Sequence, residues 1–273
     1  MLNIQIVSDI HAEFWGKKPK FNFIKPSAPI LALLGDICCC GSDDDFEIFK
    51  RFINEVLPYY ENIIMVSGNH EYYFNPTKKS TAATVNNTMD AIDAKIKAFF
   101  KETSPKLHYL NNTSLKMTVG KMTYLIVGST LWSWIPEDQR VQIQSSMNDY
   151  RYCYVQEGNG VRHINATDIA NKHLKNYKYI RSQIRKAQKV GQKVIVFTHH
   201  KPYTSPTFDP NTLDVAYESD LTVLMKKSPI VLWAYGHTHV ADDSLIEKTR
   251  LYSNPKGYPS QKTKYVKDAV VKV

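Results

Sequence analysis

Five short segments of the 273-residue chain combine carboxylate, imidazole and amide side chains in patterns that suit metal binding. They are Asp9-Ile10-His11, Gly35-Asp36, Gly68-Asn69-His70-Glu71, Thr198-His199-His200 and Gly236-His237-Thr238-His239. Oxygen and imidazole ligands without thiolates favour Mn, Fe or Zn over a structural zinc site built from cysteines. The sequence therefore predicts a metal centre to which all five segments contribute.

The ligand set is large enough for two cations that share one carboxylate. Asp9 and His11 stand two residues apart after an apolar run, so their side chains can point the same way. Asp36 follows Gly35, whose backbone freedom allows a turn that lets the carboxylate bridge two ions. Two divalent cations about 3.5–4 Å apart lower the pKa of a bridging water and clamp phosphoryl oxygens during displacement. The expected chemistry is attack of a metal-bridging hydroxide on a phosphoester, which needs no nucleophilic serine or cysteine.

The other residues of these segments complete the arrangement. Asn69 offers a neutral oxygen, which limits the negative charge around a site that must admit phosphate. His70, next to Asn69, can face the leaving group as a general acid. Three further histidines complete the metal set, namely His199, His237 and His239.

Three residues outside the ligand set are candidates for contact with the substrate. His200 neighbours a ligand, and it either supports the site or the substrate, or packs in the core. Asp149 and Tyr150 lie in an aromatic-rich segment that could reach the site. His173, by contrast, lies on an apolar helix stripe and is expected to be a core histidine.

Short apolar runs and amphipathic helices must position these residues. Four of the five segments follow directly on an apolar, β-branched run, and open α/β sheets bind ligands at such strand ends. Predicted strands are 2–7, 30–34, 63–66, 115–119, 122–127, 194–197, 230–234 and 250–253. Predicted helices are 43–57, 91–99, 165–188 and 218–227. Gly120-Lys121 indicates a two-residue hairpin, and residues 133–160 are expected to form an elaborated loop or lid beside the site.

The net charge of +9 and the pI near 9.2 predict anionic partners, either phosphorylated molecules or nucleic acid. Part of the positive charge lies on one predicted helix, at Lys172, Lys175, Lys178, Arg181, Arg185, Lys186 and Lys189. A solvated helix face is favoured over a nucleic-acid surface, since no nucleic-acid motif accompanies it.

The chain is expected to fold as one domain over residues 1–273, because one site uses ligands from Asp9 to His239. No apolar run approaches the roughly 18 residues of a membrane helix, and the first residues read as a strand rather than a signal peptide. We therefore expect a cytoplasmic location. Cys38, Cys39 and Cys40 are expected to be small buried side chains rather than a metal or redox site.

Taken in this order, the segments resemble the calcineurin-like metallophosphoesterases, also called metallo-dependent phosphatases, over about residues 2–258. The resemblance implies a four-layer α/β/β/α sandwich of two mixed β-sheets flanked by helices. It implies that one metal is held by Asp9, His11, Asp36 and His239. It implies that the other is held by Asp36, Asn69, His199 and His237, with His70 as proton donor. Further stretches, such as Met147-Asn148-Asp149-Tyr150 and Asn254-Pro255-Lys256-Gly257-Tyr258, look like a bacterial and phage subgroup of undefined substrate.

One motif departs from part of the family. Protein Ser/Thr phosphatases carry Gly-Asp-x-Val-Asp-Arg-Gly, whereas Gly35-Asp36 runs here into Ile37-Cys38-Cys39-Cys40. The second aspartate, which orients the proton-donating histidine, is absent at that spacing, and so is the substrate-holding arginine. This argues against a dedicated phosphoprotein phosphatase.

The sequence thus predicts a dinuclear phosphoesterase acting on phosphomonoesters or phosphodiesters, with a small nucleotide or cyclic nucleotide slightly favoured. One alternative is a nuclease or other nucleic-acid-processing phosphodiesterase on the same metal core, with the basic helix tracking phosphates. The other is a non-catalytic protein that keeps the metals for structure or ligand capture. The ester class, the native metal and the oligomeric state stay open.

Overall fold

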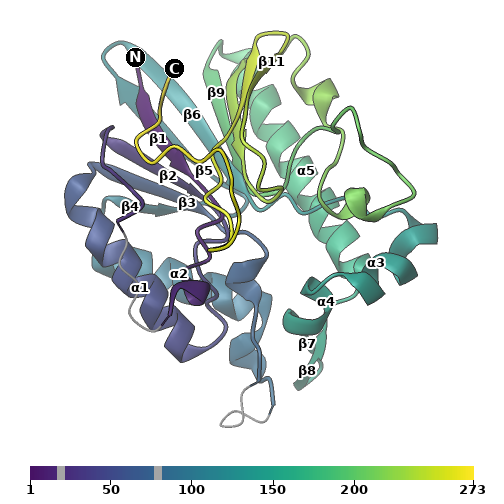
Figure 1. Ribbon diagram of the computed structural model, residues 1–273. Helices are drawn as coiled ribbons and strands as arrows, with labels where there is room; N and C mark the ends of the chain where they lie inside the picture. Colours follow the sequence, from purple (N-terminus) through teal and green to yellow (C-terminus); the bar gives the residue numbers. More distant parts are fainter. Residues whose placement is uncertain (17–21, 77–81) are drawn as a thin grey trace.

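The computed structural model describes residues 1–16, 22–76 and 82–273. Two large β-sheets face each other (Figure 1). The first has the order β13-β1-β2-β3-β4, in which β1 to β4 run parallel and β13 pairs antiparallel with β1. Its strands are β1 (Asn3–Val7), β2 (Ile30–Leu34), β3 (Asn62–Val66), β4 (Leu107–Tyr109) and β13 (Val270–Lys272).

The second sheet has the order β11-β12-β10-β9-β6-β5, with four parallel central strands and an antiparallel strand at each edge. Its strands are β5 (Thr113–Val119), β6 (Met122–Ser129), β9 (Lys193–Thr198), β10 (Ile230–Tyr235), β11 (Asp242–Ile246) and β12 (Thr249–Ser253). The predicted hairpin at Gly120-Lys121 is confirmed, because Val119 pairs directly with Met122. A separate small hairpin consists of β7 (Tyr154–Glu157) and β8 (Gly160–His163).

The longest helices cover the outer faces of the sheets (Figure 1). They are α1 (Asp43–Val56) and α2 (Met89–Thr103) on the first sheet and α5 (Ala166–Lys189) on the second. Helices α1 and α5 are capped at their N-termini, since Ser42 Oγ accepts from the Asp45 N–H at 3.1 Å and Asn165 Oδ1 accepts from the Asp168 N–H at 2.9 Å. The 3₁₀ turns are Ala12–Trp15, Leu57–Tyr59, His70–Tyr72, Val85–Asn87, Glu137–Gln139, Leu213–Ala216 and Thr222–Leu224.

Both faces of the central strands are buried, which explains their nearly continuous apolar sequences. In β2, Leu31 packs in the core beneath α1 and α2, while Ala32 packs in the core between the two sheets. In β9, Val196 packs beneath α5, and Phe197 faces the first sheet. The order of layers is therefore helix, sheet, sheet, helix, which confirms the predicted fold class of two mixed sheets flanked by helices.

The predicted helix 218–227 is wrong, since only the 3₁₀ turn Thr222–Leu224 forms there. The Ser219 N–H donates to the Lys201 carbonyl at 3.2 Å, and the Leu221 N–H donates to the Pro202 carbonyl at 2.9 Å. These long-range bonds attach the start of the segment to residues 201–202, and the Leu224 N–H then donates to the Leu221 carbonyl at 2.8 Å, the three-residue spacing of a 3₁₀ turn. The apolar spacing of the segment instead places Leu221 and Leu224 in the core beside α5.

Residues 133–160, expected to form an elaborated loop or lid, include regular secondary structure. They contain α3 (Arg140–Ser146), α4 (Asp149–Tyr152) and the strand β7. The helices are too short to show a helical period in the sequence, which is why the pattern was uninformative there.

The four cysteines are buried and free, so the expected packing role of Cys38 to Cys40 agrees with their position. Within the described ranges, each helix is too short or too polar to cross a membrane. The cytoplasmic location stays a prediction.

Candidate metal centre

All five motif segments, rather than the four expected, follow directly on a β-strand. The segments at Asp9, Asp36 and Asn69 follow β1, β2 and β3, and those at His199 and His237 follow β9 and β10. Parallel strands present their carboxyl ends at one edge of a sheet, and here the edges of both sheets meet. The two-sheet architecture therefore gathers residues that are far apart in the sequence.

Five of the candidate ligands adopt the left-handed backbone conformation, which is unfavourable for residues other than glycine. They are Asp9 (φ 55°), His11 (φ 51°), Asp36 (φ 53°), His237 (φ 70°) and His239 (φ 54°). Each such residue costs about 1–3 kcal/mol, so the surrounding structure must impose the conformation. Strain of this kind concentrates at binding sites, and here all five residues belong to adjoining groups of possible metal ligands.

One group of ligand atoms consists of Asp9, His11 and His239, whose donor atoms all lie within 4.8 Å of one another. The Nε2 atoms of His11 and His239 are 3.1 Å apart, and His239 Nε2 lies 3.4 Å from Asp9 Oδ1. Two imidazole nitrogens that face each other beside a carboxylate form a suitable cradle for a divalent cation.

A second group consists of Asp36, Asn69 and His199. His199 Nε2 lies 3.3 Å from Asp36 Oδ1 and 3.1 Å from Asn69 Oδ1. The other ring nitrogen, Nδ1, donates to the Leu34 carbonyl at 2.8 Å, which fixes the ring orientation and leaves Nε2 as the inward atom. Asp36 also reaches the first group, because its Oδ2 lies 3.8 Å from His11 Nε2.

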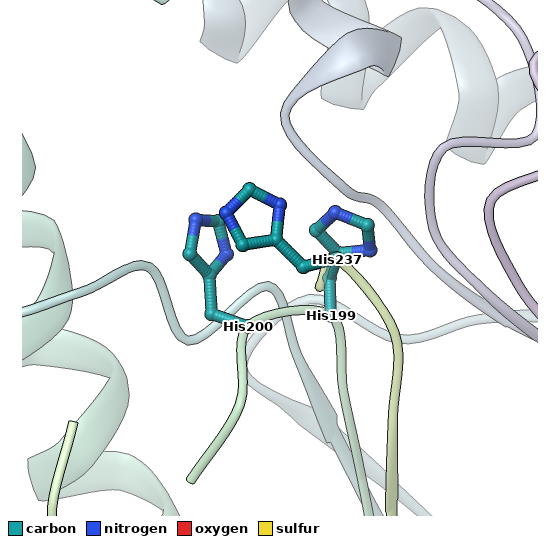
Figure 2. A group of neighbouring side chains, drawn as sticks. All are labelled: His199, His200 and His237. Atoms are coloured by element: carbon teal, nitrogen blue, oxygen red, sulfur yellow. The ribbon is translucent and has the colours of Figure 1, made fainter. Parts of the chain in front are cut away.

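His237 and His200 extend the second group (Figure 2). The ring centroid of His237 lies 4.9 Å from that of His199 and 4.0 Å from that of His200. His237 Nε2 and His200 Nδ1 are buried and lack a hydrogen-bond partner among the described residues. Burial and the charge of His199 lower the pKa of His237 to about 3, so its ring is neutral and can offer a lone pair. Orphaned neutral imidazole nitrogens in a carboxylate-rich site fit a metal.

The field of the site favours positive charge at its centre. Burial lowers the pKa of His199, but the charge of Asp36 and its hydrogen bond outweigh burial and raise that pKa to about 10. Burial raises the pKa of Asp36, yet the neighbouring histidines hold it well below its usual range. Both shifts have the same cause, which is the electrostatic attraction between the buried Asp36 carboxylate and the neighbouring imidazoles.

The structure brings all the predicted metal ligands together. Two of the predicted substrate contacts, Asp149 and Tyr150, are instead buried. Asp149 lies behind Asn69 rather than at an open surface, and its Oδ1 accepts from Asn69 Nδ2 at 2.9 Å and from the Tyr73 hydroxyl at 2.6 Å. Tyr150 is buried in the hydrophobic core cluster that also contains Ile143 and Ala166. His173 is the predicted core histidine, since it is buried with Nδ1 3.2 Å from the Leu131 carbonyl.

Two glutamates were missed as parts of the site. Glu13 Oε1 lies 2.9 Å from His70 Nδ1, and the pair is buried. Glu71 accepts from the backbone N–H groups of Asp36 at 2.9 Å and Gly68 at 2.6 Å. The sequence held signals for both, because Glu13 continues the two-residue spacing of Asp9 and His11, and Glu71 ends one of the five motif segments.

A cavity of about 140 Å³ opens onto the candidate ligands. It is lined by Asp36, Asn69, His70, Tyr73, Ser146, Met147, Asn148, Tyr217, His237, His239 and Tyr258. The Tyr217 ring stacks on His237 at 5.0 Å, and the Tyr258 hydroxyl lies 3.4 Å from His70 Nε2. The ligand atoms thus have an accessible side walled by aromatic rings.

Comparison with known proteins places this site in a family. The family model for calcineurin-like phosphoesterases matches residues 2–241. Protein L509 of Acanthamoeba polyphaga mimivirus is 30% identical over 282 residues, which cover 96% of this chain and 93% of that protein.

Solved structures share the fold. Phosphopantetheinyl hydrolase from Mycobacterium tuberculosis has a TM-score of 0.68 at 16% identity, covering 94% of this chain and 90% of its own. The structure named Putative 5'-Nucleotidase from Staphylococcus aureus has a TM-score of 0.53 at 12% identity, covering 93% of this chain and 48% of its own. The family-model match and the mimivirus relative show that the chain belongs to the calcineurin-like phosphoesterase family and is a metal-dependent phosphoesterase, in agreement with the carboxylate and imidazole groups that converge at the strand ends.

Proposed function

We propose that the protein hydrolyses small phosphoesters with two divalent cations, which are Mn, Fe or Zn. One cation would be held by Asp9, His11, Asp36 and His239, and the other by Asp36, Asn69, His199 and His237. The observation that carries this proposal is the position of Asp36, whose two carboxylate oxygens face His199 and His11 in separate groups. Such a cation pair supplies Lewis acidity towards the phosphoryl oxygens and the attacking water.

His70 is placed to deliver a proton to the leaving oxygen. It lines the cavity, and its backbone N–H donates to Asp36 Oδ1 at 2.8 Å, which fixes it beside the ligand groups. Burial lowers the pKa of His70, but the charge of Asp36 and the Glu13 hydrogen bond raise it to about 9, so the ring carries a proton to donate. We infer that His70 is the general acid.

The shape of the site supports a small substrate. The cavity of about 140 Å³ suits a phosphoryl group, and Tyr217 also lines a neighbouring cavity of about 530 Å³ that could accept a larger alcohol group. The rings of Tyr217 and Tyr258 offer faces on which a base can stack. These features support a nucleotide or cyclic-nucleotide ester, as a monoester or a diester.

We further propose that the chain acts as one domain in which residues 133–160 control access to the site. Ser146, Met147 and Asn148 from this segment line the same cavity as the candidate ligands. Asn148 directly precedes Asp149, whose carboxylate accepts a hydrogen bond from Asn69. A movement of the segment would therefore change the position of the Asn69 side chain.

The test is metal reconstitution followed by hydrolysis assays. Apo-protein is loaded with Mn²⁺, Zn²⁺ or Fe²⁺ and assayed with p-nitrophenyl phosphate, bis-p-nitrophenyl phosphate and a single-stranded oligonucleotide. We expect metal-dependent turnover of at least one small ester. Asp36→Asn should abolish it, because removal of the shared carboxylate charge affects both cations.

Four outcomes would contradict the proposal. Metal-independent turnover, or full activity of Asp36→Asn, would remove the dinuclear mechanism. Efficient cleavage of the oligonucleotide alone, with steep salt dependence, would favour the nuclease alternative. Tight metal binding without turnover of any ester would favour a non-catalytic metal-holding protein.

A further inference from the structure

We propose that Glu13 is a positioning residue that orients the His70 ring for proton donation. This inference rests on the function proposed above, in which His70 is the general acid. Glu13 Oε1 lies 2.9 Å from His70 Nδ1, and the two side chains are only 7% and 9% exposed. A buried hydrogen bond of this length to a carboxylate is strong enough to select one ring orientation.

Ring rotation is the freedom that Glu13 removes. A half-turn of the imidazole about its Cβ–Cγ bond exchanges nitrogen and carbon positions with little change in shape, so packing alone does not choose between the two orientations. The neighbouring rings constrain only the plane, with the Tyr73 centroid at 4.3 Å and the His11 centroid at 4.4 Å. Because Glu13 binds Nδ1, Nε2 is directed to the side of the Tyr258 hydroxyl, 3.4 Å away.

The carboxylate of Glu13 is itself fixed in place. Its Oε2 accepts from the Cys39 backbone N–H at 3.3 Å, and the Ala12 N–H beside it donates to the Ile37 carbonyl at 2.9 Å. The 3₁₀ turn Ala12–Trp15 is thereby attached to the loop after β2. Glu13 is thus a rigid support rather than a surface side chain in transient contact.

The contact with Cys39 lies at the position where the sequence departs from the protein Ser/Thr phosphatases. Counting along Gly-Asp-x-Val-Asp from Gly35, Cys39 stands where the protein Ser/Thr phosphatases carry their second aspartate. Here the carboxylate comes from the loop after β1 and lies against the backbone of that same position. The chain therefore supplies a histidine-orienting carboxylate from a different segment.

Glu13 also lies near one candidate metal ligand, and the test must separate the two roles. Its Oε1 is 3.4 Å from His11 Nδ1, a longer contact than the one to His70. A role through His11 would change metal affinity, whereas a role through His70 would change the sensitivity of turnover to the leaving group. These two readouts are independent.

The experiment compares Glu13→Gln with wild type on aryl phosphoesters whose leaving groups are good (p-nitrophenol) or poor (phenol). We expect kcat for the phenyl ester to fall about 10–100-fold, as part of the about 10²–10⁴-fold that general acids contribute. The p-nitrophenyl ester should lose less than about 3-fold, with KM and metal content unchanged, because a good leaving group needs little protonation. Glu55→Gln, an exposed change on α1, is the matched control.

A double variant makes the outcome decisive. In a His70→Asn background, Glu13→Gln should change neither ester's kcat further, because Glu13 acts through His70. If Glu13→Gln lowers kcat equally for both esters, or if the loss of kcat follows metal content, the positioning role of Glu13 is wrong. The general-acid function of His70 is not affected by that outcome. If His70→Asn shows no leaving-group dependence, the general-acid function fails and this inference fails with it.

Discussion

Asp36 illustrates how much of the site depends on single side chains. Its Oδ1 faces His199 at 3.3 Å and accepts from the His70 N–H at 2.8 Å, while Oδ2 lies towards His11 at 3.8 Å. A carboxylate with two usable oxygens is the shortest side chain that can serve both ligand groups. An amide in its place would present a donor to one of them.

Asp149 gives a prediction at this scale. Because it holds Asn69 Nδ2, it leaves Asn69 Oδ1 facing His199. Asp149→Ala should free the amide to rotate and weaken binding of one cation by about 10–100-fold. Asp149→Asn keeps an acceptor oxygen and should lose less. Calorimetric titration of apo-protein with Mn²⁺ measures both, and an unchanged affinity in Asp149→Ala would show that Asn69 is held by other contacts.

At the scale of elements, the loops after the strands are bound to one another. Glu71, in the turn after β3, accepts from the backbone N–H groups of Asp36, Ile37 and Gly68, the first two of which follow β2. One buried carboxylate thus fixes the register of two loops and the left-handed conformation of Asp36. This is why a residue with no place in the ligand set belongs to the site.

Loss of Glu71 should be costly. Glu71→Ala leaves three buried N–H groups without their acceptor, and each costs about 1–3 kcal/mol. We expect the free energy of unfolding to fall by about 3 kcal/mol or more, measured by urea denaturation. The exposed Glu61→Ala should cost less than about 0.5 kcal/mol. A loss in Glu71→Ala as small as in the control would mean that the loops do not depend on this carboxylate.

Gly68 tests how closely the same loops approach each other. A Cβ at this position would meet the Asp36 carboxylate and lie 2.7 Å from His199 Cε1, whereas at Gly160 the nearest atom is 3.8 Å away. Gly68→Ala should cost about 1–3 kcal/mol by overpacking and should lower metal occupancy. Gly160→Ala should do neither. Thermal unfolding and metal analysis of the two variants check this, and full occupancy in Gly68→Ala would show that the loops have room to move.

At the scale of the whole molecule, the site joins the two sheets. Asp9, Asp36 and Asn69 extend from the first sheet, and His199 and His237 extend from the second. The first sheet contributes buried carboxylates and the second contributes imidazole nitrogens, and together they form a site that a cation can fill. Bound metal should therefore act as a cross-link between the sheets.

Metal removal should destabilise the protein. Ligand present at about 1,000 times its dissociation constant contributes about 4 kcal/mol, which corresponds to a shift in Tm of roughly 8–16 °C for a chain near this size. We expect EDTA to lower Tm by an amount in this range and added Mn²⁺ to restore it. Asp36→Asn should show little response to either treatment. Equal Tm values for wild type with and without EDTA would contradict a cross-linking role.

The sequence by itself determined the fold class and predicted the candidate ligand set. Asp9, Asp36 and His239 could be predicted because ligand chemistry demands particular side chains and because each follows an apolar run that reads as a strand. The long helices were equally readable, since α5 carries both a helical period and its own caps. Such features depend on neighbours within a few residues, so they can be predicted from the sequence.

Only the tertiary structure decided which polar residues support the ligands. Glu13 meets His70 across 57 positions, and Asp149 meets Asn69 across 80, so no local pattern pairs them. The apparent helix at 218–227 failed for the same reason, because its backbone bonds to residues near Lys201. Hydrogen bonds between distant segments depend on how strand pairing places those segments in space. Local propensity contains no information about that placement.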